Sequence, residues 1–417
     1  MFPKLRFKEF DENWKEVTLK NCITSIDSGW SPQCESYPAN SSEWGVLKTT
    51  SVDWSGFNSS FNKKLPLELT PRKEIEVKPL DILVTRAGPT ERVGVVSVVP
   101  HSVRSKLMIS DKLIRLKSNE ENNPLFLGIS LSSVKCQNQL QSKTSGLAKS
   151  QTNISQKILG EVLLKLPSKE EQTKIATFLS AVDEKISQLT QKHQLLREYK
   201  QGMMQKLFSQ QVRFRADDGS EFGEWGTAKI GNIAETIFGY PFDSKEMVED
   251  NNGVPLMRGI NIGERHIRHT PELDRFFMKN ISKLEKYIVK ENDIVLSMDG
   301  SKVGRNAALV SQKDANSLLV QRVCILRENT FSNIKYIYQW IISNHFHKYV
   351  DQVKTSSGIP HISGKQIQEY EIHYPCLEEQ TKIANFLSAI DQKIEVVAQQ
   401  IEQAKQWKKG LLQNMFV

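Results

Sequence analysis

A glycine-containing stretch in the second half of the chain has residue types that could bind phosphate. Residues 358–366, GIPHISGKQ, include two glycines and then Lys365. In a phosphate loop, four residues separate the glycines and a Ser or Thr follows the lysine, because backbone N–H groups surround the phosphates and the hydroxyl binds Mg²⁺. Here five residues separate Gly358 from Gly364, and Gln366 takes the hydroxyl position. The stretch therefore does not predict a nucleotide-binding loop.

A second stretch, NPLF at residues 123–126, resembles the NPPF/Y tetrapeptide with which amino-methyltransferases hold a flipped base. Leu125 stands where that tetrapeptide has its second proline, and no glycine-rich loop for S-adenosylmethionine accompanies it. Pro124 also suits the first turn of a helix, because it has no backbone N–H to leave unpaired. We interpret the stretch as a helix start rather than a catalytic motif.

The sequence contains no pattern typical of a metal site or of a catalytic nucleophile. His345 and His347 are two residues apart, with no Cys or third His at a zinc-site spacing, so we expect a histidine pair on a helix surface. No Ser/His/Asp order or paired carboxylates stand out. The five cysteines include no CxxC pair, which favours a reducing compartment.

The composition favours a polyanionic partner. The chain has 417 residues, enough for two to four domains, and 39% of them are hydrophobic. The formal charge of +8 and the pI near 9.0 fit nucleic acid, and they also fit a basic protein with a solvated surface. No stretch is apolar enough to span a membrane, and the N-terminus is not a signal peptide. We expect a cytoplasmic protein without membrane contact.

Polar and basic residues near probable turns are the candidates for contact with double-stranded DNA. Arg and Lys in loops can reach phosphates, and Arg, Asn, Gln or His can reach base edges. Any one of them could equally be an ordinary solvated charge. The candidates are Lys48, Arg86, Arg92, Lys149 and Gln151 in the first half, and Arg258, Asn261, Arg265, His266, Arg268, Ser301, Lys302, Arg305 and His361 in the second.

An internal repeat predicts how these loops are held. EEQTKIATFLSAVDEKI at residues 170–186 returns as EEQTKIANFLSAIDQKI at residues 378–394, with 14 of 17 positions identical. Before the first copy, Ser168 and Glu171 have the spacing of a capping box, so a helix should begin there. In the second copy Cys376 replaces that serine, and the capping signal is weaker. We therefore read the chain as two halves that each end in the same helix.

Apolar residues in both copies recur at spacings of four and three, as in a coiled coil. A helix over residues 168–208 would be roughly 60 Å long at about 1.5 Å per residue. Such a spacer could hold two DNA readers more than one helical turn of DNA apart. The residues expected to join the helices and to dock partners are Ile175, Leu179, Val182, Ile186, Leu189, Ile383, Leu387, Ile390, Ile394 and Val397.

The remainder of each half predicts a mixed α/β domain. In the first half, strands are expected at residues 44–49, 81–85, 92–99 and 107–116, and one helix from Pro124 to Leu140. The second half repeats this order more weakly: VKPLDILV at 77–84 matches VKENDIVL at 289–296, and a helix is expected over residues 333–353. Because the domains differ more than the helices, the domains should do two different jobs.

The paired EEQTKIA helices, the PKLRF opening at residues 3–7 with Trp14, the DILV and DIVL runs and SGIPHIS at 357–363 together resemble the specificity subunits of type I restriction-modification systems. The resemblance implies an α/β (α+β) protein with two target recognition domains (1–166 and 209–375) and two conserved spacer helices (167–208 and 376–417). These helices would pack antiparallel, with pseudo-two-fold symmetry.

The same resemblance implies a non-catalytic DNA specificity subunit. Each recognition domain would read one half of a bipartite site, and two methyltransferase subunits would dock on the helices to methylate adenine. Restriction subunits would join them to cleave unmodified DNA. S-adenosylmethionine, ATP and Mg²⁺ would bind those partners, and no cofactor or metal would bind this chain.

Two other readings stay open on the residues alone. One is a restriction-methylation enzyme with an unrecognised catalytic region, which the isolated chain would reveal by binding S-adenosylmethionine. The other is a coiled-coil scaffold without sequence specificity, whose DNA binding would be weak and would vanish as salt rises.

Overall fold

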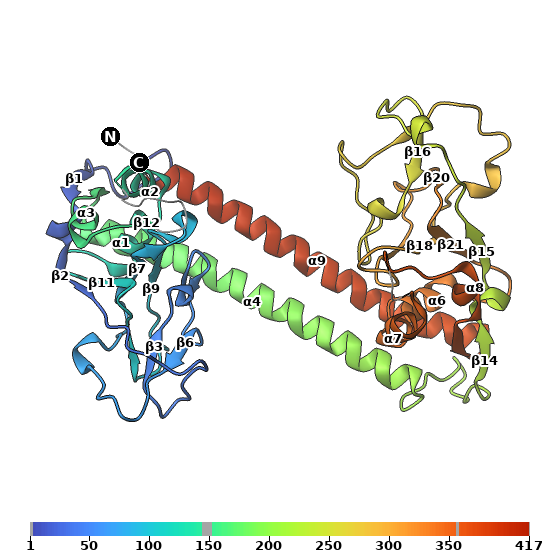
Figure 1. Ribbon diagram of the computed structural model, residues 1–417, viewed down its shortest axis with the longest axis horizontal. Helices are drawn as coiled ribbons and strands as arrows, with labels where there is room; N and C mark the ends of the chain where they lie inside the picture. Colours follow the sequence, from blue (N-terminus) through green and yellow to red (C-terminus); the bar gives the residue numbers. More distant parts are fainter. Residues whose placement is uncertain (1–2, 144–151, 356–357, 417) are drawn as a thin grey trace. The chain divides into compact units, whose positions relative to one another are not determined.

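A computed structural model describes residues 3–143, 152–355 and 358–416, and the chain forms two compact units. The first unit comprises Met1–Leu189 with Gln400–Val417, and the second comprises Thr190–Gln399. Each unit contains one mixed domain together with parts of two long helices, α4 (Lys169–Phe208) and α9 (Leu377–Met415) (Figure 1). The predicted mixed class and the repeated organisation are thus confirmed.

The domain of the first unit is built on a four-stranded antiparallel sheet. Its strand order is β2-β11-β7-β9, and a separate three-stranded sheet has the order β10-β3-β6. The strands are β1 (Lys15–Thr18), β2 (Ile23–Ser28), β3 (Gly45–Leu47), β4 (Val52–Asp53), β5 (Gly56–Phe57), β6 (Asn62–Lys64), β7 (Ile82–Thr85), β8 (Ala87–Gly88), β9 (Val96–Val98), β10 (Leu107–Met108), β11 (Leu113–Ser118), β12 (Thr152–Asn153) and β13 (Leu163–Leu166). The short helices are α1 (Pro124–Leu131), α2 (Val134–Ser142) and α3 (Gln156–Gly160).

The second unit repeats this plan. Its four-stranded sheet has the order β15-β21-β18-β19 and its three-stranded sheet the order β17-β16-β20. The strands are β14 (Gly226–Lys229), β15 (Glu235–Phe238), β16 (Val254–Met257), β17 (Phe276–Phe277), β18 (Ile294–Ser297), β19 (Ala307–Leu309), β20 (Leu318–Leu319), β21 (Val323–Arg327) and β22 (Glu371–Tyr374). The short helices are α5 (Ile230–Ile233), α6 (Ile334–Ile341), α7 (Asn344–Val353) and α8 (Gly364–Glu369).

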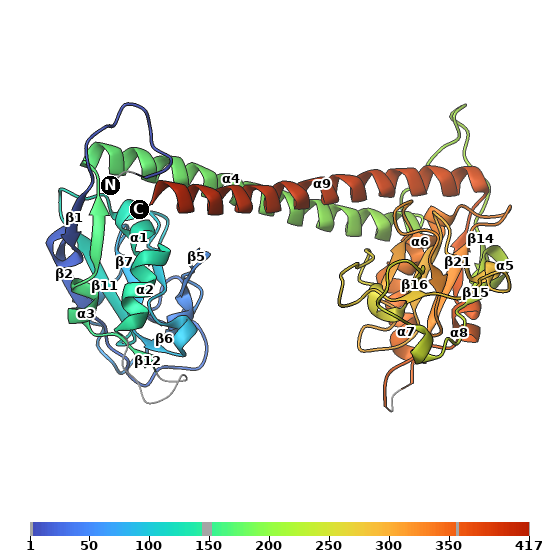
Figure 2. The same ribbon diagram turned by 90° about the horizontal axis from the view of Figure 1, so that it is seen from above.

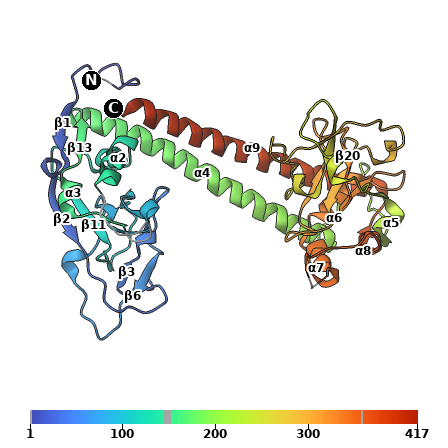
Figure 3. The ribbon, with the colours of Figure 1, turned by 45° about the horizontal axis from the view of Figure 1, so that its top comes forward.

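Pairing directions also agree between the units. In each three-stranded sheet one pair is parallel, β10 with β3 and β20 with β16, and the other pair is antiparallel. Helix α1 packs against the four-stranded sheet of the first unit through Phe126 and Leu127 (Figure 2). Within that unit, β3 and β6 lie away from the pair β1 and β13 (Figure 3).

A glycine directly follows β2 in the first unit and β15 in the second, and at each the backbone lies against another segment of the chain. A Cβ added at Gly29 would lie 1.8 Å from the carbonyl oxygen of Ile109, and one at Gly239 would lie 2.0 Å from that of Val320. Only glycine allows such an approach, because any side chain would overlap the facing backbone. The two units therefore share a close backbone contact that lies outside the repeat of residues 170–186 and 378–394.

The two helices expected from residue 124 and over residues 333–353 are each broken in two, which corrects the sequence expectation. Ser133 caps α2 by accepting a hydrogen bond from the Cys136 N–H, and Ser343 caps α7 by accepting one from the Phe346 N–H. Serine favours the cap because its oxygen pairs with an N–H group that the helix leaves open. The uninterrupted apolar spacing concealed both breaks.

The strand expected over residues 107–116 is also divided, into β10 and β11. Residues 109–112 turn between them, and Ser110 and Asp111 are polar enough to have signalled this. β10 joins β3 in the three-stranded sheet, whereas β11 joins β2 and β7 in the four-stranded sheet. One run of residues therefore links the two sheets.

The long helices run antiparallel, as seen within each unit. In the first unit the beginning of α4, with Leu179 and Val182, shares a core with Leu411 and Met415 at the end of α9. In the second unit the end of α4, with Leu207, shares a core with Leu387 and other residues from the beginning of α9. No helix among the described residues is long and apolar enough to cross a membrane.

Candidate nucleic-acid interface

The repeated helix start anchors each domain through a buried carboxylate. In the first unit Glu171 is 1% exposed and accepts hydrogen bonds from Arg6 Nε (2.7 Å) and Nη2 (2.6 Å), and from Trp14 Nε1 (3.4 Å). Ser168 accepts the Glu171 N–H as expected for a cap, but the Glu171 carboxylate turns to Arg6 instead of closing the predicted capping box. The glutamate therefore ties the N-terminal segment to the helix.

The second unit contains the same arrangement. Glu379 is fully buried and accepts hydrogen bonds from Arg213 Nε (3.1 Å) and Nη2 (2.7 Å), and from Trp225 Nε1 (2.8 Å). These charge-assisted bonds raise the pKa of Arg213, since the guanidinium is stabilised by the carboxylate. We call each group, Arg6–Trp14–Glu171 and Arg213–Trp225–Glu379, an anchor.

The next residue of the repeat fixes the first short helix. Gln172 accepts the Asn123 N–H at 3.0 Å, and Gln380 accepts the Asn333 N–H at 3.0 Å. The Asn123 side chain in turn caps α1 by accepting from the N–H groups of Leu125 and Phe126. The NPLF stretch is thus a helix start, as interpreted from the sequence.

The residues expected in the helix seam are buried or partly buried. Leu179, Leu387 and Ile383 are fully buried, Ile175, Val182, Leu189, Ile390 and Val397 are also buried, and Ile186 and Ile394 are partly buried against the cores. Because all ten are buried or partly buried, they leave little surface for a partner. The exposed large apolar side chains of the two helices are Leu195, Tyr199, Leu377, Val396 and Trp407.

A second repeated motif forms the turns that precede β7 and β18. Asp81 accepts the Lys78 N–H at 2.8 Å, and Asp293 accepts the Lys290 N–H at 2.7 Å. Asp293 also pairs with Arg327 through two bonds of 2.8 Å. The residues before the two aspartates, Leu80 and Asn292, have φ values of 67° and 66°. The DILV and DIVL runs therefore begin with the same left-handed turn.

Three loops meet in the first unit. Loop A (residues 48–53) accepts hydrogen bonds from Arg92 of loop B (residues 86–92): Arg92 Nη2 donates to the carbonyls of Val52 (2.8 Å) and Thr49 (3.3 Å). Loop C (residues 152–154) pairs with loop B through β8 and β12, and the hydroxyls of Thr90 and Thr152 are 2.7 Å apart. Loops from three distant parts of the sequence thus form one surface.

The corresponding loops meet in the second unit. Loop A (residues 258–268) contacts loop B (residues 298–305) through Lys302 Nζ and Glu264 Oε1, 2.8 Å apart. Loop C (residues 358–362) pairs with loop B at Asp299 and His361, and Gly300 donates its N–H to the Pro360 carbonyl. Both units therefore place loops A, B and C together, although their sequences differ.

The structure separates the first unit's candidates by their contacts. Arg92 is an internal brace, because it also forms an ion pair with Asp53. Lys48 is half-buried, and its side chain has no hydrogen bond or ion pair within the described residues. Arg86 is half-buried too, with a buried Nε that lacks a partner there. Lys149 and Gln151 lie outside the described residues.

In the second unit most candidates brace the loops. Asn261 is 1% exposed and donates to Arg268 O and Asp274 Oδ1. The Arg258 guanidinium donates to the Leu273 carbonyl, and burial lowers its pKa. Arg268 likewise donates to a loop carbonyl, that of Ile262. These side chains shape loop A from within.

Most of the remaining candidates of the second unit also bond to neighbouring residues. Arg305 donates hydrogen bonds to Asp351 of α7 from Nη1 and Nη2, and Arg265 Nη1 lies 4.0 Å from Asp391 Oδ1 of α9. His361 is bonded to Thr355, and His266 Nδ1 lies 3.0 Å from the Glu264 carbonyl oxygen. The remaining candidate besides Lys302 is Ser301, which is exposed on loop B.

Two basic residues beside loop B were missed from the sequence. The carbonyl of Lys112 accepts the Arg86 N–H, and the carbonyl of Arg322 accepts the Met298 N–H, each at 2.9 Å. Both side chains are exposed, and neither forms an ion pair or hydrogen bond with another residue in the described part of the chain. Lys112 was hidden because the expected strand ran through it, whereas Arg322 has a φ of 69° that its sequence does not signal.

Other expected chemistry is placed as follows. The 358–366 stretch comprises loop C and the start of α8, where Ser363 and Gln366 make a capping box. His345 and His347 lie on α7, and His345 Nδ1 is 2.8 Å from the Tyr370 hydroxyl. Among the described residues, no three His, Cys, Asp or Glu side chains are grouped so that they could hold a metal ion.

The sequence of this chain is similar to that of known proteins. The family model described as type I restriction modification DNA specificity domain matches residues 34–197 and again residues 223–406. The EcoEI specificity subunit of Escherichia coli is 40% identical over 169 residues, which cover 40% of this chain but only 28% of that subunit. The MjaVIII specificity subunit of Methanocaldococcus jannaschii is 27% identical over 350 residues, covering 82% of this chain and 79% of that subunit.

Solved structures show the same fold. The crystal structure of a type I restriction-modification S subunit from M. genitalium matches with a TM-score of 0.65 at 17% identity, over 100% of this chain and 99% of that one. A chain from a study of complex assembly and conformational transition in a type I restriction-modification system matches with a TM-score of 0.55 at 16% identity, over 98% of both chains.

Proposed function

The chain belongs to the family of type I restriction modification DNA specificity domains, and on this premise we propose that it is the specificity subunit of a type I restriction-modification complex. Each unit reads one half of a bipartite site in double-stranded DNA, and loops A, B and C form the reading surface. The observation that carries this proposal is the meeting of three loops at the same place in both units.

The contrast between frame and loops supports two different half-sites. The frame is shared, since both anchors and both DILV-type turns recur with the same contacts. The loops are not shared: Arg86 corresponds to Met298 and Arg92 to Gly304 at the offset of the aligned glycines Gly88 and Gly300. Direct base reading depends on side-chain identity, so two different loop sets select two different sequences.

We further propose that Lys112 and Arg322 contact DNA phosphates beside these loops. Both are exposed cations next to loop B, and phosphate contacts orient a protein on the duplex without reading its sequence. Arg92, Arg305 and Asn261 act indirectly, because their polar groups are committed to holding the loops.

Two methyltransferase subunits would dock on the long helices. Tyr199 and Trp407 occupy the same position in the two helix copies, 208 residues apart, and are 52% and 54% exposed. Exposed aromatic side chains of this kind are common energetic centres of protein interfaces. The partners would hold S-adenosylmethionine, ATP and Mg²⁺, methylate adenine and, with restriction subunits, cleave unmodified DNA, while this chain is not catalytic.

The complex would work in the cytoplasm, where its DNA substrate lies. The free thiols fit a reducing compartment, because Cys22, Cys136 and Cys324 are buried and unpaired.

Methylome sequencing tests the proposal. A host that carries the partner genes should show adenine methylation at one bipartite sequence with this gene present and none without it. Exchanging residues 1–166 for those of a relative should change one half of that sequence and leave the other unchanged. Unaltered methylation after either manipulation, with the hybrid complex purified intact, would contradict the function proposed here.

A further inference from the structure

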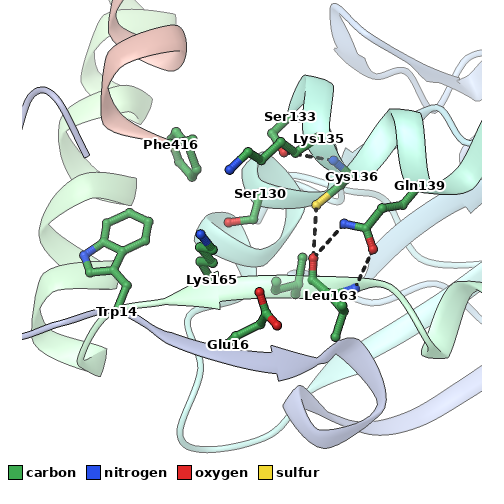
Figure 4. A pocket seen from close by; sticks show the side chains of 11 residues that line it. Trp14, Glu16, Ser130, Ser133, Lys135, Cys136, Gln139, Leu163, Lys165 and Phe416 are labelled. Carbon is green, nitrogen blue, oxygen red and sulfur yellow. Dashed lines mark hydrogen bonds between the residues drawn. The ribbon is translucent and has the colours of Figure 1, made fainter. Parts of the chain in front are cut away.

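Trp54 of the first unit differs from the other tryptophans of the chain. The other six pack against a hydrophobic core or against another ring; they are Trp14, Trp30, Trp44, Trp225, Trp340 and Trp407. Figure 4 shows Trp14 and Phe416 beside a small cavity, and their rings are in edge-to-face contact, with centroids 6.4 Å apart. Trp54 is 51% exposed, and its side chain has no ring contact or hydrogen bond within the described residues. Its indole is therefore available to a binding partner.

The backbone around Trp54 is held in place by the loops proposed to read DNA. Trp54 follows loop A at the tip of the β4–β5 hairpin, and the Asp53 carboxylate accepts hydrogen bonds from the N–H (3.1 Å) and hydroxyl (2.9 Å) of Ser55. The Asp53 carbonyl accepts a hydrogen bond from Ser97 Oγ of β9 at 2.8 Å, and Arg92 of loop B pairs with the carboxylate. The Ser55 N–H and the Arg92 guanidinium hold the pKa of Asp53 below its usual range, so this brace stays charged at neutral pH. Loop B thus fixes the hairpin that presents Trp54.

The second unit has the same hairpin with a different tip. Residues 52–57 correspond to residues 262–267 at the offset of 210 that aligns the two loops A, and the first and last residues of each hairpin are paired with each other. Trp54 then corresponds to Glu264, whose carboxylate bonds to Lys302 of loop B. The second tip is therefore charged and bound to its own unit, whereas the first carries an unengaged aromatic ring.

The surroundings of Trp54 favour a polyanion with flat apolar groups. Trp54, Ser55 and Gly56 are exposed in succession, and a Cβ added at Gly56 would meet no atom of the described residues within 4 Å. The indole is the one large side chain of this open tip. The charged side chains of loops A and B that are not paired within the described residues are Lys48, Arg86 and Glu91, with Lys112 beside them. Cations therefore outnumber acids around an exposed ring, which is the combination that binds nucleic-acid backbone and bases.

We propose that Trp54 is a wedge that enters a base step of the first half-site and stacks on the base that it uncovers. This inference rests on the proposed function and adds the residue that deforms the DNA there. Apolar side chains inserted between base pairs unstack them and kink the duplex. Because the hairpin is already braced, the indole loses little conformational freedom on binding. Pyrimidine–purine steps unstack most easily, so the wedge should lie at such a step. The second unit, with Glu264 at this place, reads its half-site without a wedge.

Photochemical cross-linking in the assembled complex tests the contact. Once methylome sequencing has given the DNA site, 5-iodouracil replaces successive bases of the first half-site, and irradiation joins it to an aromatic side chain stacked on it. Mass spectrometry should find the cross-link on Trp54. Cross-links confined to other residues of the first unit would overturn the wedge and leave the specificity function intact. Absence of bipartite methylation would instead contradict the proposed function itself.

Substitutions separate a wedge from a passive surface ring. Trp54→Ala should weaken binding of the complex to its site by roughly tenfold, in the range of base–aromatic stacking, and should reduce the DNA bend measured by fluorescence energy transfer between dyes at the duplex ends. Trp54→Phe should retain most of both, because it keeps a ring. Leu163→Ala is the matched control: Leu163 is 45% exposed on β13, whose partner β1 Figure 2 draws on the other side of the unit from β5. It should change neither.

Two results with Trp54→Ala would overturn the proposal. One is unchanged affinity and unchanged bend in an intact complex whose fold circular dichroism verifies. The other is loss of methyltransferase subunits from the purified complex, which would assign the ring to a protein interface rather than to DNA.

Discussion

The anchor of the second unit gives a quantitative prediction, because a matched control stands beside it. Glu379 is fully buried and holds Arg213 and Trp225 with three hydrogen bonds. Glu378 precedes it in the same helical turn but is exposed. Replacing either by Ala removes one negative charge near the N-terminus of α9, so the helix-dipole contribution of about 0.3–1 kcal/mol nearly cancels in the comparison.

The magnitude follows from what the substitution leaves behind. Removing one partner of a buried ion pair costs about 3–5 kcal/mol, because the other charge remains without compensation. The Arg213 side chain is 26% exposed and regains some hydration, so we place the cost of Glu379→Ala near the lower end, at about 3 kcal/mol. Glu378→Ala should change stability by no more than about 1 kcal/mol. Glu379→Gln should fall between them, since it retains the hydrogen-bond acceptor.

Urea denaturation combined with hydrogen exchange and mass spectrometry measures the effect. Hydrogen exchange in residues 213–229 reports the opening of the second unit directly. Tryptophan fluorescence does not, because the chain contains seven tryptophans and both units contribute to the signal. Equal free energies of unfolding for Glu379→Ala and Glu378→Ala would refute the anchor. Glu171 and Glu170 offer the same comparison in the first unit.

Three further predictions concern the helix pair, pH and DNA. Leu387→Asp should destabilise the second unit by about 4 kcal/mol because its side chain is fully buried, whereas the exposed Ala389→Asp should not; urea denaturation checks this. Burial lowers the pKa of Lys200 to about 8 in the folded chain. Above that pH the unfolded chain binds more protons than the folded chain, so folding becomes more favourable as the pH rises. The free energy of unfolding relative to Lys200→Met should therefore rise by about 2 kcal/mol between pH 8 and 9.5, which urea titrations measure. In complex with the partners, Lys112→Ala and Arg322→Ala should each reduce the salt dependence of DNA binding by about one ion without changing the methylated sequence; an altered sequence would assign them to base reading.

The fold could be predicted from sequence wherever a repeated pattern reports burial. The 17-residue repeat and its apolar spacing predicted two long helices, because a helix that buries one side must repeat its apolar residues every three or four positions. The DILV and DIVL runs marked the central strands because a short continuous apolar run is typical of a strand that is buried on both faces. The family resemblance rested on these segments, and the family match confirmed it.

The apolar spacing of the repeat does not explain why two polar residues recur in it. Glu171 and Gln172 are polar, yet they are buried and recur as Glu379 and Gln380, since each pair bonds to groups far away in the sequence. Arg6 lies 165 positions from Glu171 and Asn123 lies 49 positions from Gln172, so no local pattern connects them. The identity of these residues was visible, but their role as anchors required the structure.

The candidate DNA surface was decided by tertiary structure. Sequence alone marked basic residues near turns, but whether an arginine faces solvent or braces a loop depends on which carboxylate or carbonyl folds beside it. Arg92 meets Asp53 and Arg305 meets Asp351, so both are committed, whereas the overlooked Lys112 and Arg322 stay exposed. Periodicity records what each element buries locally, while the fate of a charge is set by distant groups that only the fold brings within a few ångströms.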